Sequence, residues 1–301
     1  RPRITFAVNT HDWRCIDESA DTVLRLIGLF QKHGARGDFY LTAPVVERYA
    51  EERPEVVRRL KDGGMTISYH VRAPHPLWRG FSGPLSGKEG SALEVALRDY
   101  ELHGLDLRTG QLDRGRPGGY AYVAEVFGRN PVAVGSSDAA PSVKAASGRV
   151  YAALGARVGV YYHESGTRPE QPFEFRDGLL VRPSDFSVTR IETPGDPRGI
   201  FWWNMVGTPR EKEFDPVDSL DRQIAAWAGS RAPFITALIH ENDFYRDGGP
   251  GWNSIYFEGE GPRSRPRSGP FDLDASLGGA MRPEEVREAI FRKYEALVEY
   301  A

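Results

Sequence analysis

The first third of the chain alternates between short apolar runs and longer segments in which apolar residues recur at helical spacing. Residues 4–8 (ITFAV) are apolar and β-branched, which favours a buried strand. In residues 19–33, Val23, Ile27 and Phe30 share one helical face and a glycine follows the segment, which predicts a helix. A strand at 38–42, a helix at 54–60 and a strand at 65–70 continue the alternation. This order predicts parallel βα units.

The rest of the chain continues the pattern less regularly. Helices are expected at residues 92–102, 215–227 and 283–300, with Asp215 as the N-cap of the second. Further strands are expected at residues 131–135, 157–162, 200–205 and 234–239. No change in composition resembles a linker, so the sequence predicts an α/β fold with one barrel-like domain over residues 1–301.

Two segments interrupt this rhythm. Residues 164–198 and 243–279 are rich in Gly, Pro and Asp and show little periodicity. Loops of this length in a compact domain are usually functional or disordered. We expect them at the C-terminal face of the barrel, where they would set the specificity of a site.

Composition narrows the function classes. The 301 residues carry 39 Lys and Arg against 42 Asp and Glu, a net charge of −3, so no basic surplus indicates a nucleic-acid partner. No apolar run approaches the length of a membrane-spanning helix. Cys15 is the single cysteine, so an internal disulfide is excluded. The sequence gives no indication of the oligomeric state.

Histidines and acids gather where the predicted strands end, which is the site-bearing edge of a parallel barrel. His11 and Asp12 follow the first strand, His70 and His75 follow the third, and His240 ends the last. Imidazole and carboxylate are the preferred ligands of zinc and similar divalent ions. Such an ion lowers the pKa of bound water, and a base and an acid then complete the hydrolysis of an amide or ester.

Five segments, in order, carry a family resemblance. They are ITFAVNTHDW, LIGLFQKHGARGDFYLT, EVVRRLKDGGMTISYHVRAPHP, RPGGY and FITALIH. Together they resemble the polysaccharide deacetylase family (the NodB homology domain, carbohydrate esterase family four). The resemblance implies a distorted (β/α)7 barrel and a divalent metal, zinc first and cobalt or nickel as alternatives. It also implies a carbohydrate substrate that loses N- or O-linked acetyl groups, and an extracytoplasmic location.

The resemblance also implies a set of metal ligands, and this sequence departs from the family pattern at two points. Asp12, His70 and His75 would hold the metal, and His11 would activate water in place of the family's aspartate. In the other alignment of the first motif, Asn9 replaces that aspartate and His11 is the ligand. The second departure is the spacing of His70 and His75, which have four residues between them where the family usually has three.

The remaining roles follow from the same matches. Arg116 would orient the catalytic base. His240 would protonate the leaving group, with Asp243 or Glu241 orienting its ring. Gly118 and Gly119 would let the backbone approach the substrate closely. Trp13 and Trp78 would stack on sugar rings.

Two other functions stay open. The resemblance extends to enzymes of the allantoinase-like branch that open cyclic amides, and a metal-free protein that keeps His70 and His240 would favour that activity. The replacement of a base carboxylate by Asn9 would also suit a catalytically inactive barrel that binds glycans.

Overall fold

The computed structural model describes residues 4–78, 80–136, 140–161, 174–182, 201–202, 215–226, 235–246, 255–259, 265–269 and 280–301. Among them, nine strands form one sheet in the order β10-β11-β1-β2-β3-β6-β7-β9-β8. These strands are β1 (Ile4–Thr10), β2 (Gly37–Leu41), β3 (Thr66–His70), β6 (Ala133–Ser136), β7 (Val158–Tyr161), β8 (Glu174–Arg176), β9 (Leu179–Arg182), β10 (Phe201–Trp202) and β11 (Ile235–His240).

The sheet has the strand order of a parallel barrel. Apart from β8, neighbours in the sheet follow the chain from β1 to β9, and β11 returns to pair with β1. All the pairings are parallel except that of β8 with β9. Among the described residues, the two edge strands of this sheet, β8 and β10, do not pair, so the barrel is open between them. The predicted α/β fold with a distorted barrel is thereby confirmed.

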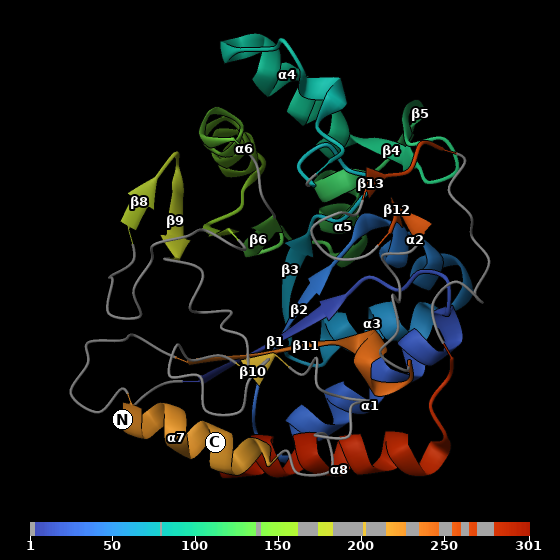
Figure 1. The fold of residues 1–301 in the computed structure, drawn as a ribbon, viewed down its shortest axis with the longest axis vertical. Helices are drawn as coiled ribbons and strands as arrows, with labels where there is room; N and C mark the ends of the chain where they lie inside the picture. The colour runs from blue at the N-terminus through green and yellow to red at the C-terminus, as the bar shows by residue number, and fades with distance from the viewer. Residues whose placement is uncertain are drawn as a thin grey trace.

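Helices connect the strands and cover the outside of the sheet (Figure 1). They are α1 (Ile16–Lys32), α2 (Ala43–Glu52), α3 (Pro54–Asp62), α4 (Gly90–Leu102), α5 (Gly119–Phe127), α6 (Pro141–Leu154), α7 (Pro216–Ala226) and α8 (Glu284–Tyr300). Two short antiparallel pairs lie apart from the main sheet, β4 (His103–Asp106) with β5 (Gln111–Pro117) and β12 (Phe257–Glu258) with β13 (Arg265–Pro266).

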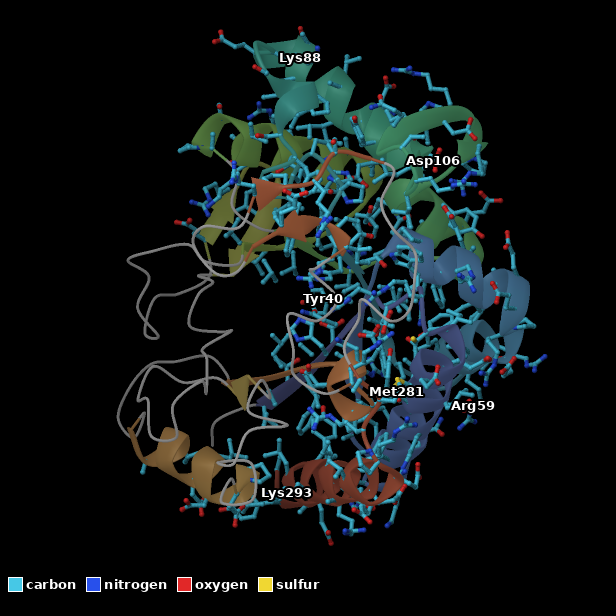
Figure 2. The ribbon with its side chains drawn as sticks, turned by 45° about the vertical axis from the view of Figure 1, so that its right-hand side comes forward. Tyr40, Arg59, Lys88, Asp106, Met281 and Lys293 are labelled. Atoms are coloured by element: carbon cyan, nitrogen blue, oxygen red, sulfur yellow. The ribbon has the colours of Figure 1, made fainter. Side chains whose placement is uncertain are left out.

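Aromatic packing joins the first and last helices to the sheet. The Phe30 ring on α1 lies 5.6 Å from Phe6 of β1 and 6.1 Å from Tyr294 of α8, measured between centroids. Arg25 of α1 forms a bidentate ion pair with Glu288 of α8. Figure 1 shows α8 along the lower edge of the molecule, and in Figure 2 Lys293 on this helix lies at the opposite end from Lys88. Helix α8 therefore closes the core beside β1.

Most expected elements are present. The helices expected at 19–33, 54–60, 92–102, 215–227 and 283–300 correspond to α1, α3, α4, α7 and α8, and Asp215 caps α7 by accepting the Val217 N–H at 2.9 Å. Helices α2, α5 and α6, the β4–β5 pair and the short strands β8, β9, β12 and β13 were not expected. Most of the two long loops lies outside the described residues. Within the described part, no helix is both long and apolar enough to cross a membrane.

Candidate functional site

Three histidine rings meet at the C-terminal ends of β1, β3 and β11. His70 ends β3, His240 ends β11, and His11 follows β1 directly. The His11 ring centroid lies 5.1 Å from that of His240 and 6.0 Å from that of His70. All three side chains are buried. The strand-end positions predicted from sequence are therefore brought together, because β11, β1, β2 and β3 are successive neighbours in the sheet.

The His240 ring is held from two sides. Asn9 is its register partner on β1, and the Asn9 side-chain Nδ2 lies 3.3 Å from His240 Nε2. On the other side, the Asp243 backbone N–H donates to the His240 ring, and the Asp243 carboxylate accepts the His240 backbone N–H. Of the two acids expected to orient this ring, Asp243 contacts it, with Oδ2 at 3.6 Å from Nδ1.

Burial keeps two of the rings neutral. It lowers the pKa of both His11 and His70 well below the usual value, and the nearby Arg72 guanidinium lowers each further. Charging one ring would also disfavour charge on its neighbours. At neutral pH, His11 and His70 are therefore imidazoles able to accept a proton.

The Asp12 carboxylate contacts two arginine side chains and a tyrosine hydroxyl. Its Oδ2 accepts from Tyr245 Oη at 3.0 Å and Arg246 Nε at 3.3 Å, and Oδ1 lies 3.6 Å from Arg14 Nε. Oδ1 also accepts the backbone N–H groups of Arg14 and Cys15. The carboxylate expected to bind a metal thus has protein donors on both oxygens.

His75 is similarly engaged. Its Nδ1 accepts the Leu77 backbone N–H at 3.1 Å, and its Nε2 lies 3.0 Å from Oε1 of the buried Glu101. In a neutral ring that accepts at Nδ1, the proton sits on Nε2 and faces this carboxylate. Neither nitrogen of His75 therefore presents a lone pair to a metal.

The expected metal set does not fit an ion in this arrangement. Both oxygens of Asp12 have protein donors, and His75 accepts a hydrogen bond at Nδ1 and has Nε2 within ion-pair distance of Glu101. Among the described residues, no group of three or more His, Cys, Asp or Glu is arranged to hold a metal ion. Since a catalytic zinc takes three protein ligands, we derive no chemical step through a metal.

Arg116 lies outside this cluster. It lies on β5, where its Nη1 is 2.7 Å from Glu47 Oε2 and its Nε is 3.9 Å from Asp113 Oδ2. These contacts place its guanidinium against α2 and its own strand, and among the described residues no contact with His11 or Asp12 supports the expected orienting role.

The two glycines approach protein backbone. A Cβ at Gly118 would clash with the His103 carbonyl oxygen. Gly119 has φ +58°, and its Cβ would lie 2.5 Å from the Glu101 Cα. The RPGGY segment therefore needs its glycines to pack against the end of α4 and the start of β4.

A cavity opens beside His70. Its wall includes Trp13, His70, Arg72, His75 and Tyr100, and Gly119 also borders it. Trp78 packs beside it, with its ring 4.5 Å below the Arg72 guanidinium carbon and 6.4 Å from the His70 ring. Trp13 and Trp78 therefore lie at the site as expected, and their stacking on a sugar stays a prediction.

Glu241 has a role that the sequence did not indicate. Its Oε1 accepts the backbone N–H groups of both His11 and Asp12 at 2.5 Å. Burial is the main cause that raises the pKa of Glu241, to about 8. It thus fixes the backbone on which His11 stands. Its place next to His240 was visible in the sequence, but the direction of its side chain was not.

The comparisons with known proteins find likeness in structure only. No protein-family model matches the chain, and no curated protein matches its sequence. A solved structure assigned as a polysaccharide deacetylase, from Mycobacterium smegmatis, is 16% identical, covering 79% of this chain and 76% of its own, with a TM-score of 0.42. A CE4-family pseudoenzyme from Bacillus anthracis is 10% identical over 81% of this chain and 57% of its own, with a TM-score of 0.35.

A third similar structure is a peptidoglycan N-acetylglucosamine deacetylase. It is 10% identical, covers 79% of this chain and 71% of its own, and has a TM-score of 0.34. Polysaccharide deacetylases are therefore among the structural neighbours, as the sequence motifs predict. A likeness of this degree carries no information about activity, and the set contains both an enzyme and a pseudoenzyme.

Proposed function

We propose that this protein hydrolyses an amide or ester bond of a carbohydrate by acid–base catalysis with histidines. The observation that supports it is the placement of His240, held between Asn9 and Asp243 with its ring 5.1 Å from that of the neutral His11. A positioned pair of imidazoles supplies the base and the acid that acyl transfer to water requires.

The two rings take different parts in the proposed reaction. His11 accepts a proton from water as the water oxygen bonds to the acyl carbon. His240 carries a proton at Nε2 when the Asn9 side chain turns its amide oxygen, in place of Nδ2, to the ring, and it gives this proton to the leaving nitrogen or oxygen as the bond to the acyl carbon breaks. Asn9 and Asp243 position His240, and Glu241 positions the backbone of His11 through its two accepted N–H groups.

Turnover with matched histidine variants tests this proposal. Wild type, His240→Asn and His11→Asn are compared on a chromogenic acetyl ester, an acetylated oligosaccharide and a cyclic amide. His103→Asn serves as control, because this histidine lies on β4 outside the cluster. We expect each site variant to lose about 100-fold or more in kcat/KM, the usual range for one acid–base group, and the control to keep it. Equal activity in all four proteins would overturn the proposal.

The choice of substrates separates the related activities. Turnover of the acetylated substrates would support deacetylation. Turnover of the cyclic amide alone would show that the protein opens cyclic amides instead. Activity that survives dialysis against a chelator supports catalysis without a metal. Activity that is lost on dialysis and restored by zinc would show that catalysis depends on a metal ion.

The second candidate is carbohydrate binding without turnover. It is favoured by the amide of Asn9 beside His240, where the resemblance leads one to expect a base carboxylate. Binding of an oligosaccharide with no release of acetate over the same period would support this candidate against hydrolysis.

A further inference from the structure

The cavity beside His70 has mostly apolar walls. Val71 and Ala73 come just after His70 in the chain, line the cavity and are buried. Leu105 on β4 and Leu107 just after that strand are half-buried and line the same cavity. Half-buried leucines at a cavity leave apolar surface for a ligand to cover, and covering it is favourable through the hydrophobic effect.

Two polar side chains of the wall already have protein partners. Glu47 Oε2 lies 2.7 Å from Arg116 Nη1. His75 accepts the Leu77 backbone N–H at Nδ1, and its Nε2 lies 3.0 Å from Glu101 Oε1. These two side chains therefore do not need a ligand to satisfy them.

Few polar groups of the wall remain for a ligand. Thr42 is buried, and its Oγ1 has no hydrogen-bond partner among the described residues. The Arg72 guanidinium packs over the Trp78 ring, with 4.5 Å between its carbon and the ring centre. A sugar ring carries several hydroxyl groups, and each needs a partner when it is buried. The walls therefore suit an apolar group better than a sugar ring.

The cavity reaches the histidines that we assign to catalysis. His70 lines it, and the His70 ring lies 6.0 Å from the His11 ring. Trp13, two positions after His11 in the chain, lines it as well. A substrate whose acyl carbon lies at the His11 and His240 rings can therefore extend its acyl chain past His70 and between these walls.

We propose that this cavity is an acyl-binding site, and that the carbohydrate substrate carries an apolar acyl group larger than acetyl. This extension rests on the proposed function. The cavity measures about 480 Å³, counted with its opening to solvent. A water molecule takes up about 30 Å³ in the liquid, and an acetyl group takes up about twice that volume. Acetyl would therefore leave most of the apolar wall uncovered.

A series of acyl esters tests the site. The full chain is assayed on the p-nitrophenyl esters of acetate, butyrate and hexanoate, which share one leaving group. Wild type is compared with Leu105→Trp, in which the larger side chain is expected to fill part of the cavity. Leu180→Trp is the matched control, because this leucine is partly exposed on β9 and does not line the cavity. Thermal unfolding identifies a variant that fails to fold, and Leu107→Trp takes the place of Leu105→Trp in that case.

The expected result is a preference for longer acyl groups that depends on Leu105. We expect kcat/KM of wild type to rise about fourfold for each methylene group added, the effect of burying one such group. In Leu105→Trp the ratio of the hexanoate value to the acetate value should fall about tenfold or more, as if two methylene groups were kept out of the cavity. Leu180→Trp should keep the wild-type ratio. A wild type that prefers acetate, or the same ratio in wild type and the folded cavity variant, would overturn the acyl site.

Binding without turnover is the second measurement. Hexanamide and acetamide, which are both uncharged, are titrated into wild type and Leu105→Trp and followed by NMR. We expect wild type to bind hexanamide about tenfold more tightly than acetamide, or more, and Leu105→Trp to lose most of that difference. Equal binding of the two amides by wild type would overturn the site.

These outcomes are distinct from failure of the proposed function. Hexanamide binding that depends on Leu105, in a protein that hydrolyses none of the substrates above, would refute hydrolysis and leave the acyl site standing. Turnover that depends on His240, with no gain from a longer acyl group, would support hydrolysis and overturn the acyl site.

Discussion

Asn9 and His240 are register partners on adjacent parallel strands, and their side chains meet 3.3 Å apart although 231 positions separate them in the chain. Partners in a parallel pair point to the same face of the sheet, so strand pairing alone brings the amide to the imidazole. This contact positions the ring that we assign as the acid.

Replacement of Asn9 by Ala is expected to release the His240 ring on that side. We expect kcat to fall by about tenfold with little change in KM, because Asn9 acts through His240. The free energy of unfolding should fall by about 1–2 kcal/mol, since a buried ring loses a polar partner. Steady-state kinetics and urea unfolding measure both, with the exposed Gln111→Ala as control. A KM effect alone would assign Asn9 to substrate binding.

The raised pKa of Glu241 predicts a pH dependence of stability. Its pKa rises from 4.5 to about 8 on folding, so the folded protein holds an extra proton between these values. This group therefore stabilises the fold at low pH and loses that contribution as pH rises through about 8, on the order of a few kcal/mol. In Glu241→Gln the dependence should be absent, because the amide does not titrate. Urea unfolding from about pH 5 to about pH 8 measures it.

The exposed Glu89→Gln is the control for this measurement and should keep the wild-type pH dependence. Identical profiles for wild type and Glu241→Gln would show that Glu241 titrates alike in the folded and unfolded chains.

His70 predicts a dependence of opposite sign. Burial and Arg72 lower its pKa, so the folded state keeps it neutral below pH 6.5, where the unfolded chain takes up a proton. Its contribution is present above about pH 6.5 and is lost as pH falls below that value. Because Glu241 contributes with the opposite sign over this range, the expected effect is a relative one: from about pH 5 to about pH 7.5 the unfolding free energy of His70→Asn should rise less, or fall more, than that of wild type. The same change with pH in wild type and His70→Asn, with His33→Gln as control, would contradict neutral burial.

Asp12 is predicted to stabilise arginines and to bind no metal. Asp12→Asn should lower the free energy of unfolding by about 3 kcal/mol, since Arg246 and Arg14 lose a buried carboxylate. Metal content by mass spectrometry should stay the same in the variant and in His70→Ala. Near-stoichiometric zinc that both variants lose would restore Asp12 as a ligand. Asp113→Asn, on an exposed pair, is the control.

Gly119 is predicted to tolerate no side chain. Gly119→Ala would introduce a Cβ at φ +58° and 2.5 Å from the Glu101 Cα, so we expect a loss of about 2 kcal/mol or more in unfolding free energy. Gly28→Ala on α1 meets no atom within 4 Å and should be neutral or raise stability by up to about 1 kcal/mol. Equal stability of the two variants would contradict the close packing at Gly119.

The positions of His11, His70 and His240 could be predicted from sequence because strand periodicity places them. Each follows or ends an apolar run, and parallel strands bring such ends to one edge of the sheet. The order of the strands follows from the same alternation of strand and helix. Periodicity alone therefore places these three histidines at one edge of the sheet.

The direction of the side chains could not be predicted in the same way. Asp12 faces Arg246, which lies 234 positions later, and His75, in the segment after β3, faces Glu101 on α4. Such contacts depend on which distant residues pack together, and local spacing holds no information about them. The cation-rich surroundings of His11 were missed for the same reason.

The pairing of β1 with β11 has a consequence for how the protein is made. Closing so long a stretch of chain is entropically slow, so contacts between these strands form late in folding. On the ribosome, His11 and His70 emerge early, but the strand that carries His240 emerges only after residue 234. Until then the edge of β1 is unpaired and open to other chains. We expect nascent chains to depend on chaperones at this stage, and the site to be completed near the end of synthesis.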